Sequence, residues 1–105
     1  NKTEQIMKVS LTKHAKDRIY QRVGITVNAD IIDTTNLFYA KKYKNKTTNN
    51  PMTLYVIPVR KQDPIVLAVD TLLKTVTTVM TEGPTVVEAV RKYNSYTTSK
   101  ARAMA

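Results

Sequence analysis

Residues 65–71 have the sequence Ile-Val-Leu-Ala-Val-Asp-Thr. It is almost entirely apolar and rich in strand-forming residues, which predicts a central strand of a sheet. The segments on either side, residues 52–60 and 74–81, are also rich in residues that favour strands. Because the link between residues 71 and 74 is so short, we expect an antiparallel hairpin there. The broken alternation at Thr78 and Val79 predicts a bulge in the later strand.

A fourth strand is expected at residues 37–46, where the chain becomes aromatic and basic. Two helices are expected before it. The first covers residues 12–24, with Thr12 as N-cap and Gly24 as the left-handed residue that ends it. The second covers residues 28–36. The apolar stripe of the first helix recurs every four residues and comprises Ala15, Ile19 and Val23.

A C-terminal helix is expected to start at Gly83 and Pro84, because proline suits the first turn of a helix. Residues 97–105 are polar and expected to fray. The 105 residues predict one domain, 1–105, with its core at 8–96. The predicted fold class is α+β, with two N-terminal helices, a four-stranded bent antiparallel sheet and one C-terminal helix.

The net charge of +9, from 17 basic and 8 acidic residues, predicts a polyanionic partner such as RNA or DNA. Solubility alone is the alternative reading of this charge. The chain has no cysteine and no apolar run of about 18 residues, so we expect a cytoplasmic location and no membrane partner. The basic residues gather in two clusters: Lys13, Lys16, Arg18 and Arg22, and Lys41, Lys42, Lys44 and Lys46.

The candidate catalytic residues are His14, Arg18 and Arg22, which recur every four residues and so share one side of the predicted helix. Metal-free RNA cleavage needs a base for the 2′-hydroxyl, an acid for the 5′-oxygen and cations for the phosphorane charge. The single histidine could titrate, and arginine binds phosphate bidentately. The second proton-transfer role would fall to a Lys or Tyr, to Asp17 or Glu82, or to charge stabilisation alone.

Further nucleic-acid contacts are expected from lysines that follow a phosphate backbone and from tyrosines that position or stack bases. These candidates are Lys13, Lys41, Lys42, Lys44, Lys46, Tyr43, Tyr55 and Arg60. Structural roles are the alternative: His14 could bond a sheet carbonyl, and the tyrosines could pack in the core. Arg18 and Arg22 could instead form salt bridges, with Asp17, Asp70 or Glu82 as partners.

The segments Lys-His-Ala-Lys-Asp-Arg-Ile-Tyr-Gln-Arg-Val-Gly-Ile (residues 13–25), LYVIPVR (54–60), IVLAVD (65–70) and TVTTVMT (75–81) together resemble the DUF4258-like group of small proteins. The resemblance covers roughly residues 8–81. That group is similar to RelE-like and BrnT-like toxins and to phage early-mRNA endoribonucleases. The resemblance implies a RelE-like, microbial-ribonuclease fold and a toxin-like, metal-independent endoribonuclease, with RNA as substrate and an antitoxin or host enzyme as protein partner.

Two other functions stay open. One is a non-catalytic regulator, encoded by a phage or plasmid, that binds nucleic acid or a host nucleic-acid enzyme. The other is a subunit of an assembly, with Val86, Val87 and Val90 docked on another chain. We expect no cofactor and no metal centre, since the chain has one histidine, no cysteine and no clustered acidic motif. The oligomeric state is left open.

Overall fold

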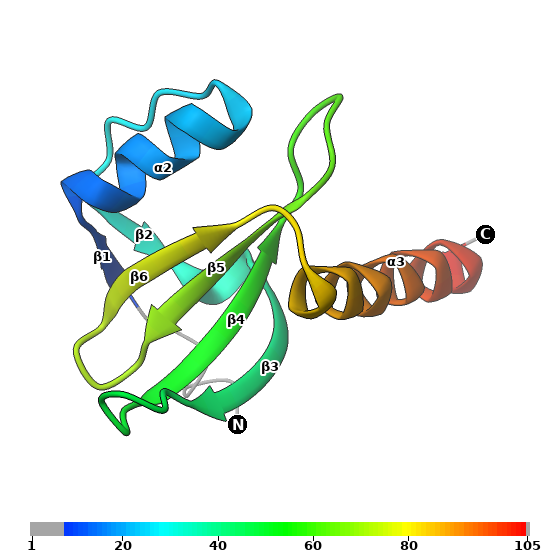
Figure 1. Ribbon diagram of the computed structural model, residues 1–105. Helices are drawn as coiled ribbons and strands as arrows, with labels where there is room; N and C mark the ends of the chain where they lie inside the picture. The colour runs from blue at the N-terminus through cyan, green and yellow to red at the C-terminus, as the bar shows by residue number, and fades with distance from the viewer. Residues whose placement is uncertain (1–7, 105) are drawn as a thin grey trace.

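The structure is a computed structural model that describes residues 8–104, without the side chains of Asn36 and of residues 101–104. A six-stranded mixed sheet lies between two helices (Figure 1). The elements are β1 (Lys8–Leu11), α2 (Lys13–Val23), β2 (Ile31–Asp33), the 3-10 turn η1 (Thr34–Asn36), β3 (Phe38–Lys44), β4 (Pro51–Ile57), β5 (Ile65–Asp70), β6 (Thr75–Met80) and α3 (Pro84–Met104).

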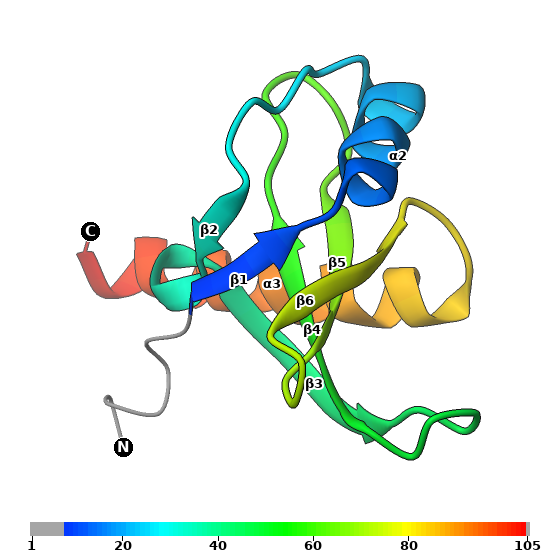
Figure 2. The same ribbon diagram turned by 90° about the vertical axis from the view of Figure 1, so that its left-hand side faces the viewer.

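The strand order is β2-β1-β6-β5-β4-β3, and every neighbouring pair is antiparallel except β1 and β6, which run parallel. The sheet curls, so that β1 and β2 turn toward the side that carries α2 (Figure 2). The strands β3 and β2 form its two edges. The edge strand β3 is therefore separated from β6, the strand next to α2, by β4 and β5.

The central strand β5 is buried at all six positions. Its alternate side chains enter two different cores: Ile65, Leu67 and Val69 face α2, whereas Val66 and Ala68 face α3. Both faces of the strand are covered by a helix, which explains the uninterrupted apolar run. The prediction of a central strand at this position is confirmed.

The first predicted helix is also confirmed, as α2. The Thr12 hydroxyl accepts a hydrogen bond from the Ala15 N–H at 3.1 Å, as an N-cap does. Gly24, with φ of 74°, ends the helix, and its N–H donates to the Tyr20 carbonyl at 2.8 Å. Ala15 and Ile19 are buried against the sheet.

The second predicted helix, at residues 28–36, is wrong. This segment forms the short strand β2 and the turn η1. Ile32 pairs with Val9 of β1, and β-branched residues fit a pleated strand better than a helix. Asp33 does not sit inside a helix. Its carboxylate accepts from the Thr35 N–H and hydroxyl, which favours a tight turn over helix propagation.

The predicted fold class is therefore wrong as well. It had two N-terminal helices and a four-stranded antiparallel sheet of the RelE-like type. The short strands β1 and β2 extend the sheet to six strands, and β1 makes it mixed. Ser10 and Leu11 pair in parallel with Thr75 and Val76. Such a pairing joins residues 65 positions apart in the chain, and no local sequence signal encodes it.

The bulge in β6 is at Thr77, one residue before the predicted position. Ala68 pairs with Thr78 while Val69 pairs with Val76, so Thr77 is the extra residue. Its hydroxyl donates to the Ala68 carbonyl at 3.2 Å. Because of the bulge, Val76 and Val79 both reach the core under α2.

The helix α3 starts at Pro84, as predicted, and packs against β3, β4 and β5. Val86 is buried and Val90 partly buried against the chain's own sheet, whereas Val87 is 55% exposed. The helix continues to Met104, beyond the sheet (Figure 1). Fraying of its last turns stays a prediction. Neither of the two helices in residues 8–104 is long and apolar enough to cross a membrane.

Candidate functional site

His14, Arg18 and Arg22 form a row along one side of α2, which we call the α2 row. Arg18 Nε donates a long hydrogen bond to His14 Nε2 at 3.5 Å. Residues four apart on a helix are surface neighbours, which explains this contact. Arg22 Nη1 lies 3.5 Å from the Thr81 hydroxyl and 4.0 Å from the Glu82 carboxylate. The row therefore extends from the first turn of α2 to the end of β6.

The charges in the α2 row are largely free for a ligand. His14 and Arg22 are exposed and Arg18 is half-buried. Within residues 8–104, no carboxylate lies within 4.0 Å of Arg18, and the pair of Arg22 with Glu82 is loose and solvated. The predicted salt-bridge alternative therefore applies to Arg22 only. The contact places the His14 imidazole directly beside the Arg18 guanidinium.

The neighbouring lysines of α2 differ from the row. Lys16 is paired with Asp30, and the hydrogen bond and charge of Lys16 hold the pKa of that carboxyl below its ordinary value. Lys13 is exposed next to His14, but it lines a shallow hollow together with Lys16 and Tyr20. The basic cluster predicted for this helix thus divides into two lysines, of which Lys16 is paired, and the α2 row.

The second basic cluster lies on the other side of the molecule, on the edge strand β3 (Figure 1). Lys41, Lys42 and Lys44 are exposed along this strand, and Lys46 is exposed in the turn that follows it. The strands β4 and β5 separate β3 from β6, the strand next to α2, so the structure does not bring the two predicted clusters together. They are two separate cationic surfaces.

Tyrosines accompany these lysines. Tyr43 is 37% exposed, and its partial burial raises the pKa of the phenol. Tyr39 is 48% exposed, and Lys42 Nζ lies 5.9 Å from the centre of its ring. We call this surface the β3 edge. It comprises Tyr39, Lys41, Lys42, Tyr43 and Lys44.

Tyr55 is not available for the nucleic-acid contact predicted for it. It is buried in the core under α2, with its ring edge-on to that of Tyr39 at 6.4 Å between centres. Its role is packing, which was the stated alternative. The strand pairing places Tyr39 directly opposite Tyr55. Tyr55 is buried, and Tyr39 is the exposed ring of the two.

Arg60 lies in the exposed loop between β4 and β5. This loop is joined to the end of α2, since Gln62 Nε2 donates to the Val23 carbonyl at 3.1 Å. The contact brings the loop of Arg60 close to the Arg22 end of the α2 row. The structure thus groups Arg60 with α2 and not with the β3 edge.

Two contributors were absent from the predicted site. Thr81 contacts Arg22 across the fold, and no local signal could have revealed that contact. Tyr39 shares a face with Lys42 although the two are three residues apart. In a regular strand such residues point to opposite faces, but the bulge at Ala40 shifts the register and brings them together.

Other site types find no support in the described residues. No group of three or more His, Cys, Asp or Glu side chains that could hold a metal ion lies within residues 8–104. Asp70, considered as a partner for the arginines, instead bonds to Asn50 at the far end of the sheet. Comparisons with protein-family models, with curated proteins and with solved structures find no match for the chain. What the protein does has to follow from its own side chains.

Proposed function

We propose that the protein is a cytoplasmic, metal-independent endoribonuclease of a toxin-like or phage-encoded kind, and that the α2 row is its active site. One observation carries the proposal: an exposed imidazole lies next to an arginine that no carboxylate neutralises within the described part of the chain. The net charge of +9 and the resemblance of residues 13–25 to DUF4258-like proteins support it further.

In the proposed reaction, His14 Nε2 leaves its long contact with Arg18 and takes the proton of a ribose 2′-hydroxyl. The 2′-oxygen then attacks the adjacent phosphorus, the bond from phosphorus to the 5′-oxygen breaks, and a 2′,3′-cyclic phosphate forms. Arg18 and Arg22 bind the non-bridging oxygens, where negative charge develops in the transition state. The departing 5′-oxygen takes a proton from water, since the chain contains no second histidine.

An end-labelled single-stranded RNA and a DNA of the same sequence, incubated with the protein in EDTA buffer, test the proposal. We expect discrete cuts in the RNA with 2′,3′-cyclic phosphate ends, and an intact DNA, which lacks the nucleophile. RNA that stays intact at every pH and salt concentration would contradict cleavage. Cuts that end in a 3′-hydroxyl would contradict the proposed mechanism.

The β3 edge favours a second candidate, a non-catalytic nucleic-acid-binding regulator. Its lysines can follow a phosphate backbone and its exposed tyrosine rings can stack bases, yet it contains no histidine that could act as a general base. Binding that weakens steeply with salt, without any RNA cleavage, would favour this candidate. Salt-insensitive capture of one host enzyme would favour a protein partner for the regulator.

A further inference from the structure

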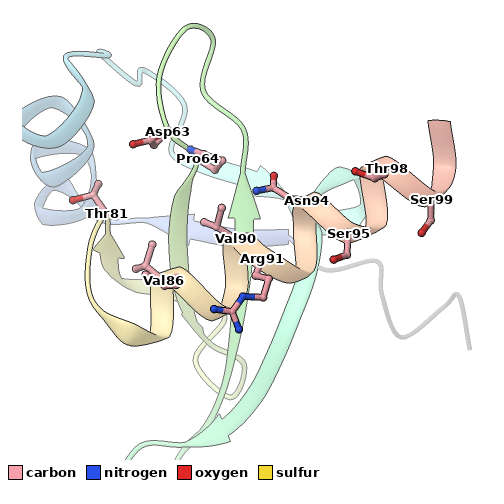
Figure 3. A pocket seen from close by; sticks show the side chains of 11 residues that line it. Asp63, Pro64, Thr81, Val86, Val90, Arg91, Asn94, Ser95, Thr98 and Ser99 are labelled. Atoms are coloured by element: carbon pink, nitrogen blue, oxygen red, sulfur yellow. The ribbon is translucent and has the colours of Figure 1, made fainter. Parts of the chain in front are cut away.

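An open groove of about 730 Å³ lies between α3 and the loop that joins β4 to β5 (Figure 3). The loop contributes Asp63 and Pro64, and the end of β6 contributes Thr81. The rest of the lining comes from α3 and combines an apolar floor with exposed polar side chains. These are Val86, Val87, Val90, Arg91, Asn94, Ser95, Thr98 and Ser99.

The polar side chains of this groove are not used by the fold. Arg91, Asn94, Ser95 and Thr98 are exposed, and none of their side chains makes a hydrogen bond or ion pair within residues 8–104. They lie on α3, in and after the turns where Val90 and Tyr93 pack on the sheet. A helix face that carries a guanidinium and several free amide and hydroxyl groups can bind an anionic, hydrogen-bonding ligand.

The groove is continuous with the α2 row. Thr81 lines the groove, and its hydroxyl lies 3.5 Å from Arg22, the last member of the row. Figure 3 shows Thr81 between α2 and the start of α3. The α2 row from His14 to Arg22 spans eight residues, which corresponds to about 12 Å along a helix. A bound strand that follows the row past Thr81 therefore enters the groove.

We propose that this groove holds the nucleotides on one side of the cleaved bond, as a subsite for single-stranded RNA. The proposal rests on the proposed function of the α2 row. Arg91 would bind a phosphate, while Asn94, Ser95 and Thr98 would bond to 2′-hydroxyls and base edges. The volume suits a few nucleotides and not a double helix. Val87, which is 55% exposed, provides an apolar surface for a base or sugar.

Asp63 makes the two sides of the subsite differ in charge. It is the only carboxylate among the lining residues, and it lies on the loop side, opposite α3. A carboxylate repels phosphate, so the backbone of the strand should follow the Arg91 side and leave its bases toward the loop. Asp63→Asn should therefore tighten RNA binding, whereas Arg91→Ala should weaken it.

The test uses an RNA with a single cut site and compares wild type with Arg91→Ala, the double variant Asn94→Ala/Thr98→Ala, and Lys100→Ala. Lys100→Ala is the matched control, because it removes one positive charge from α3 outside the groove. We expect Arg91→Ala to raise KM about tenfold and Lys100→Ala to change it less than twofold. Each nucleotide near the cut, except the one whose 2′-hydroxyl is the nucleophile, is also replaced in turn by its 2′-deoxy form.

In wild type, one or more of these deoxy replacements should raise KM several-fold. In the double variant the same replacements should have little effect on KM, because the side chains that bond to the 2′-hydroxyls have been removed. Suppose that wild type cuts RNA, that Arg91→Ala behaves like Lys100→Ala, and that the double variant is as sensitive to deoxy replacement as wild type. The groove proposal is then contradicted, while the proposed function of the α2 row stands. If wild type neither binds nor cuts RNA, the proposed function fails and the groove proposal fails with it.

Discussion

Asn50 Nδ2 donates a hydrogen bond to Asp70 Oδ2 at 2.8 Å, and so joins the turn between β3 and β4 to the turn between β5 and β6. The other oxygen of Asp70 accepts from the N–H groups of Leu73 and Leu72, at 2.9 and 3.0 Å. The buried Asp70 thus fixes the end of the sheet where these two turns meet.

These contacts make stability depend on pH. The Asn50 side chain and the N–H groups of Leu73 and Leu72 hold the pKa of Asp70 below its ordinary value. A lowered pKa contributes stability that is present above the unfolded-state pKa, about 3.9, and is lost as pH falls through the folded-state pKa. We expect urea midpoints of wild type to fall between pH 5 and pH 2 more steeply than those of Asp70→Asn. Parallel curves for the two proteins would contradict this role.

The two-sided burial of β5 predicts a large effect of truncation. Leu67 is fully buried in the core under α2, so Leu67→Ala should lower the free energy of unfolding by about 2–5 kcal/mol. Leu72→Ala removes the same atoms from a side chain that is 65% exposed, and should cost less than about 0.5 kcal/mol. Urea unfolding of both variants measures the difference. Equal losses would mean that β5 is not the centre of the fold.

The β3 edge predicts how strongly RNA binding depends on salt concentration. Replacing Lys41, Lys42 and Lys44 with alanine should reduce the slope of log K against log salt by about 2 for a single strand, since each phosphate contact contributes about 0.7. Lys74→Ala, which removes one exposed charge from the turn before β6, is the control. Fluorescence anisotropy with a labelled RNA gives both slopes. A triple variant with the wild-type slope would remove the β3 edge from the interface.

Local signals explain which elements the sequence could predict. The apolar run of β5 and the Thr12 and Gly24 ends of α2 are complete within a few residues, so they were found correctly. The strands β1 and β2 have only four and three residues, and their pairing depends on β6 and on each other. A preference for strand or helix summed over so few residues is too weak to decide between the two.

The same distinction applies to the site. The spacing of four residues was enough to place His14 next to Arg18, because a helix guarantees that neighbourhood. The contact of Arg22 with Thr81 joins residues 59 apart and could come only from the tertiary structure. The burial of Tyr55 also depends on which face of β4 the helix α2 covers, and alternation alone does not reveal that.

If His14 is the base of an RNA-cleaving site, His14→Ala should lose most of the cleavage activity. End-labelled RNA in EDTA buffer is compared for wild type, His14→Ala and Gln21→Ala, an exposed residue of α2 outside the row. Because His14 is exposed, the thermal unfolding of all three should coincide. The proposal predicts that His14→Ala lowers the cleavage rate at least about 100-fold while Gln21→Ala cuts like wild type. Equal cleavage by His14→Ala and wild type would contradict it.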